Sequence, residues 1–455
     1  MSKPVLSICI PTFNRADMLG LLLENIRDEC RHLLDKVEIV VSDNASEDHT
    51  GSTVRASGLP VVYHRNPTNI GFSANLLHVT ARLASAEYVW VVGDDDLILP
   101  GGVARVLDSI ARAPDVDYHY VNFGWIGTQL RRRMAQAPNP DMTDFPLEHL
   151  QCDLREWRRL EQLEDLTALP GRNPSVLFSC IFSFVSRRRF FSEALEWLNP
   201  SASLDGSSTH IDDCFPHAML TLPRVVGRPV AYIGLPCVLQ TIGGWEWKAY
   251  ANKNMIFGIH QFFRWLEGKG FGREGMERLW ASYHDMAGRL FSRMQCYQEE
   301  NKGFDIVMRE AIPDAASHGA FWEAFMAETR TSIETDYEAG MLARAARDFV
   351  RRHPGARLGL WGIQGRGYRF LKETPDLYGN MVWVADRDAR LHGDALEYTT
   401  LEVSDPASLR EQALDCLVIA TRRDFIDEVI ATASASLPPG TVFISTNGLS
   451  THEAR

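Results

Sequence analysis

The chain has 455 residues, 45% of them apolar and 23% charged, which is ordinary for a globular protein and long enough for two or three domains. Its formal net charge of −12 argues against a general nucleic-acid binder. The eight cysteines form no CxxC pair, which disfavours a zinc ribbon or dithiol redox centre. The sequence has no signal peptide and no stretch of about 20 apolar residues. We therefore expect a cytoplasmic protein without a transmembrane segment, with peripheral contact at the inner face of the membrane left open.

Strand-like and helical segments alternate along the first hundred residues. Strands are predicted at 5–10, 37–41, 61–63 and 88–92, the first of them as a buried run. Apolar residues recur at helical spacing over 18–34 and 72–83. This alternation predicts a parallel sheet, and ligands of such sheets bind beyond the carboxyl ends of the strands.

Polar residues follow three of these predicted strands. They are Thr12, Asn14 and Arg15 after the first strand, Asp43 and Asn44 after the second, and Asp94, Asp95 and Asp96 after the fourth. Each cluster alone could be a turn or a helix cap. Their convergence on one edge of the sheet favours a binding site. Because adjacent carboxylates repel and are costly to bury unpaired, we also expect a positive group near the three aspartates.

The rest of the chain indicates a helical middle and a second α/β segment. Strands are predicted within 176–185 and 225–240, and residues 251–350 are largely helical. From residue 357 a strand, a Gly-rich turn, a helix and a strand ending in Asp386 predict a small Rossmann-like domain. The predicted α/β chain therefore divides into residues 1–250, a helical linker domain at 251–345 and an accessory domain at 346–455.

Four motifs in the first part of the chain carry a resemblance to a known family. IPTFNR, VVSDNASEDHT, NIGFSANL and WVVGDDDLILP, in this order, resemble the family-2 glycosyltransferases, which have the GT-A fold. The residues of these motifs are most similar to those of bacterial enzymes that build O-antigen or capsule, including the abequosyltransferase-like group. The resemblance implies an inverting, metal-dependent transfer of a sugar from a nucleoside-diphosphate donor to a hydroxyl of a glycan or lipid-linked oligosaccharide acceptor.

The resemblance also implies roles for the aspartates. Mg²⁺ or Mn²⁺ prefers carboxylate oxygens and would stabilise the charge on the leaving diphosphate. Asp96 matches the metal-ligand position and Asp95 the position that contacts ribose or metal. Gly93 stands where the family usually has its first acid, so the roles of Asp94 and Asp95 remain exchangeable. Asp43 matches the aspartate that recognises the nucleobase. The implied donor-binding set is Pro11, Thr12, Asn14, Arg15, Asp43, Asn44, Asn69, Gly71, Asn75, Asp94 and Asp95.

A late acidic pair in STHIDDCFPHAML matches the place of the family's catalytic base. Asp213 is the preferred base and Asp212 the alternative. The competing interpretation is that these acids only cap a helix and have no catalytic role. His217 follows Asp213 by one helical turn and could be a metal ligand or a packing residue. Downstream aromatic side chains could bind the acceptor or lie in an interdomain core: Trp245, Trp247 and Tyr250.

The C-terminal segment has a second candidate site. Gly362, Gly365 and Gly367 form a G-x-x-G-x-G pattern, and Asp386 ends the next strand as a ribose-binding acid would. The segment resembles the C-terminal Rossmann-like domain of sugar C-methyltransferases. It could bind a nucleotide or NAD(P), or the glycines could simply permit a tight turn.

Three other functions compete with the transferase. A nucleotidyltransferase would need a glycine-rich basic loop after the first strand, but the first glycine is Gly20. A bifunctional enzyme would add a sugar-modifying oxidoreductase and would use a Tyr-x-x-x-Lys pair on a helix of the C-terminal domain, and we do not expect such a pair between residues 341 and 455. A sugar-nucleotide sensor would bind the donor without turnover, and the acidic pair at Asp212 and Asp213 argues against it.

Overall fold

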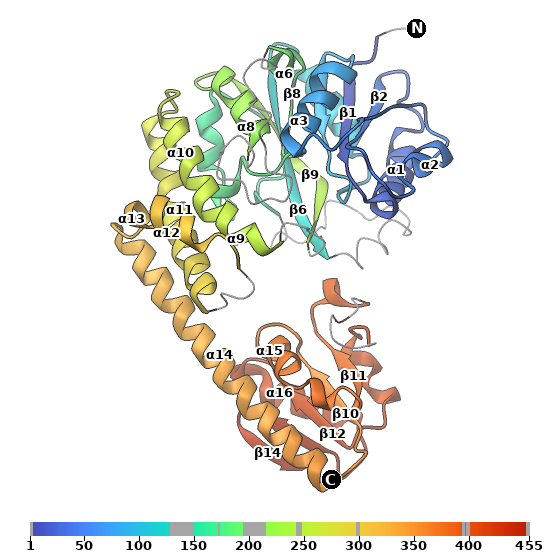
Figure 1. Ribbon diagram of the computed structural model, residues 1–455, viewed down its shortest axis with the longest axis vertical. Coiled ribbons are helices and arrows are strands. Elements are labelled where there is room, and N and C mark those ends of the chain that lie inside the picture. The colour runs from blue at the N-terminus through green and yellow to red at the C-terminus, as the bar shows by residue number, and fades with distance from the viewer. Residues whose placement is uncertain are drawn as a thin grey trace. The chain divides into compact units, whose positions relative to one another are not determined.

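The computed structural model describes residues 3–127, 150–171, 173–193, 215–242, 248–296, 301–393, 396 and 401–451. The described residues form two compact units, those within 1–126 and 134–326 and those within 127–133 and 327–455. Figure 1 labels their elements along the chain. Among the described helices, none is both long enough and apolar enough to cross a membrane.

The first unit contains a nine-stranded mixed sheet in the order β3-β2-β1-β4-β8-β6-β9-β5, with β7 beside β9. Its parallel strands are β1 (Leu6–Thr12), β2 (Val37–Asp43), β3 (Val61–Arg65) and β4 (Tyr88–Val91). The other strands are β5 (Leu97–Ile98), β6 (Tyr118–Gly127), β7 (Arg158–Leu160), β8 (Phe184–Arg187) and β9 (Val230–Ile242). The antiparallel pairs are β8 with β4 and β6, and β9 with β5 and β7. The predicted parallel sheet is therefore confirmed for the first four strands, and β8 begins an antiparallel extension.

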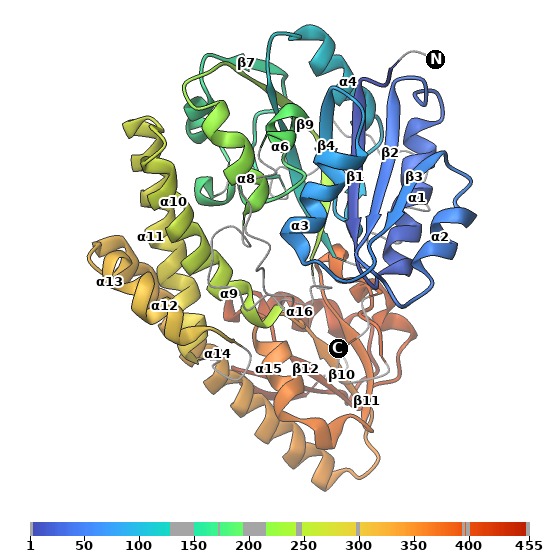
Figure 2. The same cartoon turned by 45° about the horizontal axis from the view of Figure 1, so that its top comes forward.

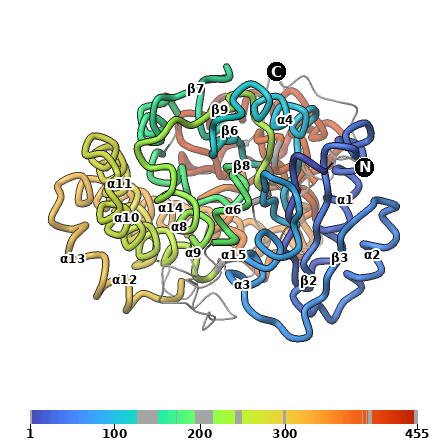
Figure 3. Tube along the Cα trace, turned by 90° about the horizontal axis from the view of Figure 1, so that it is seen from above, coloured from blue at the N-terminus to red at the C-terminus, as the bar shows by residue number. Residues whose placement is uncertain are grey.

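Helices connect the four parallel strands, and a further helix follows β5. They are α1 (Ala16–Cys30), α2 (Thr50–Ala56), α3 (Phe72–Leu77), which continues as a π-helical turn over His78–Leu83, and α4 (Gly102–Arg112). The strands β1 and β4 are buried along their whole length, as expected for near-continuous apolar runs in a sheet covered on both faces. The strands β2 and β3 lie side by side, with α2 near β3 (Figures 2 and 3).

The predicted strand over 176–185 is largely wrong. Pro174–Val176 is a 3₁₀ turn, and β8 starts only at Phe184. The Asn173 side chain accepts a hydrogen bond from the Ser175 amide and Pro174 occupies the first helical position, so this apolar run begins as a capped turn.

The helical segment completes the first unit and extends into the second. Its helices are α6 (Arg189–Ser192), α8 (Pro216–Thr221), α9 (Ala251–Lys253), α10 (Ile259–Glu267), α11 (Arg273–Cys296), α12 (Phe304–Glu310), α13 (Ile312–Ala315) and α14 (Gly319–Arg352). Phe262, Tyr283 and Phe291 share one hydrophobic core with the sheet. The described helices up to residue 326 therefore lie in the same compact unit as the sheet.

The second unit contains a five-stranded sheet in the order β11-β10-β12-β13-β14. Its strands are β10 (Leu358–Trp361), β11 (Met381–Ala385), β12 (Cys416–Ile419), β13 (Val442–Ser445) and β14 (Gly448–Thr451). The first four are parallel, β14 is antiparallel to β13, and the helices α15 (Arg366–Glu373) and α16 (Ile426–Ser434) follow β10 and β12. This arrangement confirms a small parallel-sheet domain at the C-terminal end; β14 was not predicted.

Candidate functional site

The three aspartates lie where β4 ends and the chain turns toward β5. Asp94 and Asp96 are 5% and 3% exposed. The Gly93 amide donates a hydrogen bond to Asp96 Oδ2 at 3.0 Å. A Cβ atom on residue 93 would lie 2.7 Å from the same oxygen. This close approach explains why glycine, and not an acid, occupies the position before the triplet.

The positive group expected near the aspartates is Arg15. Its Nη1 atom lies 3.1 Å from Asp94 Oδ1 and 3.2 Å from Asp95 Oδ2. Thr12 Oγ1 donates a hydrogen bond of 2.8 Å to Asp94 Oδ2. Thr12 is the last residue of β1, and Arg15 follows it by three residues. Because β1 pairs with β4, the polar residues after β1 meet the aspartates after β4, and the predicted convergence of these two clusters is confirmed.

Asp94 is a buried carboxyl group held by its neighbours. The pKa of Asp94 is raised to about 6, mainly by burial and in part by the neighbouring Asp95 charge, although the Arg15 guanidinium lowers it. The hydrogen bond from Thr12 also lowers the pKa but does not offset the burial. Because each Asp94 oxygen already accepts a hydrogen bond from another element, this residue is placed to orient Thr12 and Arg15.

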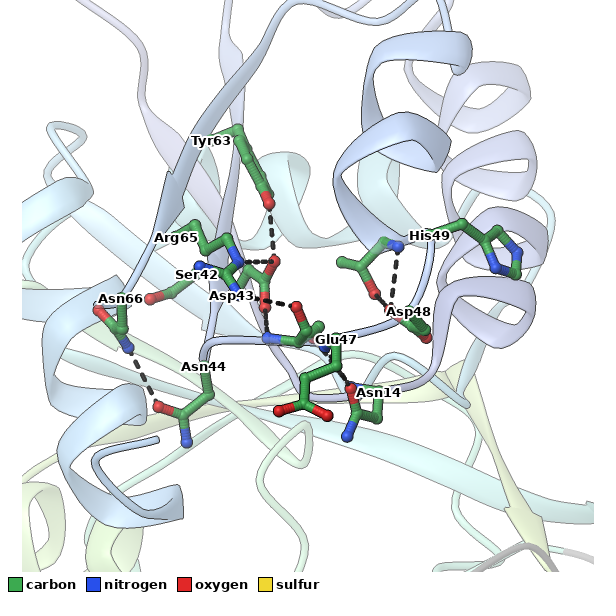
Figure 4. Close-up of polar contacts among 12 residues, drawn as sticks. Asn14, Ser42, Asp43, Asn44, Glu47, Asp48, His49, Tyr63, Arg65 and Asn66 are labelled. Carbon is green, nitrogen blue, oxygen red and sulfur yellow. Dashed lines mark hydrogen bonds and ion pairs between the residues drawn. The ribbon is translucent and has the colours of Figure 1, made fainter. Parts of the chain in front are cut away.

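Asp43 ends β2 with both carboxylate oxygens engaged (Figure 4). Its side chain is 1% exposed, Oδ1 accepts from the Ser46 amide at 2.8 Å, and Oδ2 accepts from the Tyr63 hydroxyl at 2.7 Å. Arg65 Nε lies 3.9 Å from Oδ2. Burial and the hydrogen bond to Asp43 raise the pKa of the Tyr63 hydroxyl. Tyr63 and Arg65 were not predicted from the sequence; their period-two spacing on β3, which pairs with β2, was the signal that could have identified them.

A network of amide side chains supports the segment after β3. Asn44 donates to Asn69 Oδ1 at 2.7 Å and accepts hydrogen bonds from Asn66 Nδ2 at 3.2 Å and the Ile70 amide at 3.0 Å. Asn69 also accepts from the Gly71 amide. The structure thus brings together three predicted residues, Asn44, Asn69 and Gly71, through contacts within the loop.

Asn75 belongs to the same network. It accepts hydrogen bonds from the Ser42 hydroxyl at 2.7 Å and from Asn66 at 2.9 Å, and it donates to the Ser42 carbonyl at 3.0 Å. The side chain is 2% exposed, so its polar atoms are used to join α3 to β2. Asn66 and Ser42 were missed because an isolated Asn or Ser gives no signal in a single sequence.

Asn14 joins the loops that follow β1 and β2. Its amide donates to Ser46 Oγ at 2.9 Å, and its side-chain oxygen accepts from the Glu47 amide at 2.8 Å. The backbone φ of 52° places Asn14 in the left-handed region, which asparagine tolerates better than most residues. Pro11 lies inside β1 opposite Ser42, and Thr12 lies opposite Asp43. These residues therefore set the spacing between the two carboxylate clusters.

His217 lies in α8 with 1% of its surface exposed. Its Nε2 atom is 3.0 Å from the Phe178 carbonyl oxygen, and its ring stacks on Phe184 with centroids 5.6 Å apart. Burial lowers the pKa of His217 to about 4. These contacts favour the packing interpretation over the metal-ligand one.

Other predicted site residues lie outside the described residues. They are Asp212, Asp213, Trp245 and Trp247. Tyr250, the third predicted aromatic residue, is described; the ammonium groups of Lys253 and Lys302 lie 5.4 and 5.6 Å from its ring centroid.

The predicted second site is a tight turn in the second unit. Gly362 and Gly365 have φ angles of 91° and 52°, and a Cβ atom on Gly367 would lie 1.8 Å from the Gly362 carbonyl oxygen. Asp386 Oδ2 accepts from the Ile363 amide, and Asp386 Oδ1 accepts from the Asp388 amide, both at 2.9 Å. The turn therefore accounts for the three glycines and engages both carboxylate oxygens of the predicted ribose-binding acid.

The helix after this turn contains a Tyr-x-x-x-Lys pair, Tyr368 and Lys372. Lys372 is exposed and Tyr368 is half-buried. The Arg369 guanidinium lies 5.8 Å from the Tyr368 ring centroid. The expectation that residues 341–455 lack this spacing is therefore wrong, because the pair lies on α15, directly after the glycine turn.

The chemistry of the aspartate triplet fits a hard divalent cation. Within the described residues, no group of three His, Cys, Asp or Glu side chains is arranged to hold a metal ion by itself. Mg²⁺ in nucleotide sites typically uses one or two carboxylates and completes its coordination with phosphate and water. The triplet therefore fits a cation that arrives with a diphosphate better than an ion held by protein alone.

Part of the chain matches a known family. Residues 7–187 match the model described as Glycosyl transferase family 2. Abequosyltransferase RfbV of Salmonella typhimurium is 37% identical over 114 residues, which are 24% of this chain and 34% of that protein. An uncharacterized glycosyltransferase of Haemophilus influenzae is 28% identical over 116 residues, 26% of this chain and 38% of that protein. The resemblance predicted from the motifs is confirmed over residues 7–187. The segments aligned with the two relatives span little more than a third of each relative's length.

Solved structures show a weaker likeness. S. aureus TarS 1–349 in complex with UDP-GlcNAc is 14% identical, with a TM-score of 0.43 over 73% of this chain and 86% of that one. The mannosyltransferase PcManGT of Pyrobaculum calidifontis, in complex with GDP-Man and Mn²⁺, is 15% identical, with a TM-score of 0.40 over 72% of this chain and 86% of that one. We draw no conclusion from either likeness, because both TM-scores lie below 0.5.

Proposed function

We propose that the first unit is an inverting, divalent-metal-dependent glycosyltransferase. It would move a sugar from a nucleoside-diphosphate donor to a hydroxyl of a glycan or glycolipid acceptor during surface polysaccharide synthesis. One observation carries the proposal: within the region that matches the family, Thr12 at the end of β1 and Arg15 before α1 contact the aspartate triplet that follows β4. This is the edge of the sheet where α/β proteins bind nucleotides.

The charge balance of the triplet supports a divalent cation. Three carboxylates gather at the end of β4, and two of them share the guanidinium of Arg15. Asp96 and Asp95 would hold the cation, and Asp94 would keep Arg15 and Thr12 in position. When bound, the cation would neutralise the charge that develops on the leaving diphosphate.

Arg15 would contribute a second positive charge to donor binding, in addition to the cation. The Arg15 side chain is 21% exposed while the Asp94 side chain is only 6% exposed, so the guanidinium lies between a buried carboxylate and solvent. A diphosphate arriving at this edge would meet a fixed positive charge, and the planar guanidinium can donate to phosphate oxygens.

Asp43 would recognise the nucleobase. Its carboxylate is fixed by the Ser46 amide and the Tyr63 hydroxyl, and carboxylate oxygens have further lone pairs that could accept from a base N–H. Tyr63 would then be a positioning residue for this contact. The acceptor hydroxyl would lose its proton to Asp213, with Asp212 as the alternative base, as the family resemblance implies.

Calorimetry of nucleotide binding tests the proposal. We would titrate UDP, GDP, CDP and dTDP into the full chain with and without Mn²⁺, and compare wild type with Asp96→Ala. Asp108→Ala is the matched control, because Asp108 is 53% exposed on α4 and pairs only locally with Arg112. Metal-dependent binding of one nucleotide, lost in Asp96→Ala and kept in the control, supports the transferase. Binding that ignores both Mn²⁺ and Asp96 contradicts it.

A further inference from the structure

The second unit has a topological switch point at the carboxyl end of its central strand. The chain leaves β10 through α15 to reach β11 on one side of β10, and β12 pairs on the other side of β10. Ligands of open parallel sheets bind in the crevice at such a point. This edge lies wholly within the second unit and does not depend on the transferase proposed for the first unit.

Two arginines meet at this edge on one buried carboxylate. Arg366 begins α15 directly after the glycine turn, and Arg423 follows β12. The Nε atoms of both arginines contact Glu338 of α14, at 2.8 Å from Oε1 for Arg423 and through Oε2 for Arg366. The Glu338 side chain is 5% exposed.

One arginine would neutralise Glu338, so the second leaves a net positive charge on the cluster. The Nη atoms of Arg366 and Arg423 have no further partner among the residues that the structure describes. Two guanidinium groups are thus fixed through their Nε atoms while their Nη donors remain available. Paired guanidinium groups of this kind are suited to phosphate oxygens.

Further donors lie beside the arginines. In the described part of the chain, the amides of Gln364, Gly365 and Arg366 have no hydrogen-bond acceptor. The hydroxyl of Thr421 is also buried without a partner there. A Cβ atom placed on Gly362 would lie 3.1 Å from Thr421 Cγ2, so Thr421 is next to the turn. Consecutive backbone amides at a glycine turn can donate hydrogen bonds to the same anion.

We infer that this edge of the second unit binds a phosphate group, as free phosphate or as a small phosphate monoester. Arg366, Arg423 and the turn amides would donate to its oxygens. Asp386 contributes no donor to this site, and its two oxygens accept hydrogen bonds from the Ile363 and Asp388 amides.

Phosphate titration of the full chain in a phosphate-free buffer tests the inference. We expect inorganic phosphate to bind wild type, and Arg366→Gln and Arg423→Gln each to weaken binding at least about tenfold, the effect of about 1.4 kcal/mol. Arg344→Gln, at an exposed arginine of α14, should leave the phosphate affinity unchanged. Asp96→Ala should also leave it unchanged, which separates this site from the donor site in the first unit.

A second variant distinguishes phosphate binding from a structural role of the arginines. Glu338→Gln removes the competing carboxylate and keeps both guanidinium groups, so we expect phosphate affinity to be retained or increased. Thermal unfolding of each variant identifies any that fail to fold. Absence of phosphate binding in wild type, or phosphate affinity equal to that of wild type in both arginine variants, would overturn the inference. So would tighter binding of NAD⁺ than of phosphate, with competition between the two.

Discussion

The two units place an aspartate at the end of a parallel strand in different surroundings. In the first unit, Asp43 and Asp94 accept hydrogen bonds from side chains on other elements, namely Tyr63, Thr12 and Arg15. In the second unit, Asp386 accepts from backbone amides of its own and the adjacent turn. The same residue type at the same topological position thus organises a side-chain cluster in one sheet and closes a turn in the other.

This difference shows that the position of an acid at the edge of a sheet does not define its role. A carboxylate that accepts from backbone amides provides a partner for N–H groups of the turn that would otherwise have none. A carboxylate engaged by Thr, Tyr and Arg side chains fixes groups that can contact a ligand. The following substitutions test whether the first unit uses its carboxylates for ligand binding and whether the second unit needs the glycines of its turn for stability.

The largest effect is expected for Asp96→Asn in the first unit. Loss of a charged ligand to the proposed cation should reduce the rate of sugar transfer at least about 100-fold, the order seen when one preorganised electrostatic contact is removed. Steady-state assays with the donor identified by calorimetry measure this effect. Asp108→Asn should retain the wild-type rate, and a similar rate in both variants would show that the triplet is not the donor site.

Gly367→Ala should strongly destabilise the second unit. The new methyl group would lie 1.8 Å from the Gly362 carbonyl oxygen, so the turn must move. We expect a loss of about 3 kcal/mol, the upper part of the range for overpacking. Hydrogen exchange of β10 and β12 reports on this unit alone, because a chain of two units need not unfold in one step.

Gly379→Ala is the matched control for this change, because a Cβ atom there meets no atom within 4 Å. Nucleotide binding by the first unit should be the same in both glycine variants. Unchanged hydrogen exchange in Gly367→Ala would mean that the turn accommodates the methyl group, and the structural explanation of the glycine would fail.

His217 should make stability depend on pH in a defined direction. Its pKa is lowered from 6.5 to about 4 by burial. Between these values the unfolded chain binds a proton that the folded chain does not, so stability falls as the pH falls through this window. At pH 5 the loss relative to pH 7 should be about 2 kcal/mol for this group.

Urea unfolding at the two pH values measures this contribution. His217→Gln should show a smaller loss at pH 5, whereas His49→Gln, at a side chain that is 62% exposed, should behave as wild type. Mn²⁺-dependent nucleotide binding should persist in His217→Gln. Its disappearance in a folded variant would instead support the metal-ligand interpretation of His217.

The smallest effect is expected for Tyr63→Phe. The change removes the hydroxyl that donates to the buried Asp43 at 2.7 Å, and should lower the free energy of unfolding by about 1 kcal/mol. It should also weaken nucleotide binding, because Asp43 loses a positioning contact. Tyr337→Phe, at a side chain that is 63% exposed, is the control for losing a hydroxyl. Equal stability and affinity in the two variants would show that Tyr63 does not position Asp43.

Much of the parallel part of the fold could be predicted from the sequence. The first four strands, the helical region and the small C-terminal sheet follow from apolar period and turn residues, which are local properties. The apolar run over 176–185 was misread because Asn173 and Pro174 cap a turn, a local competition that hydrophobicity alone does not report. The antiparallel strands β8 and β9 and their partners depend on long-range pairing, which has no local signal.

The sequence by itself determined which carboxylates end buried strands, that a positive group must lie near Asp94, Asp95 and Asp96, and which family motifs residues 7–187 contain. Only the tertiary structure decided which group this is and what each acid contacts. Arg15 is 79 residues from Asp94, and the two meet because β1 and β4 are neighbours in the sheet. Likewise, Asp386 could be assigned to its turn only once the Ile363 amide, 23 residues away, was seen to reach it. Composition and spacing are fixed along the chain, whereas hydrogen-bond partners depend on which strands pair.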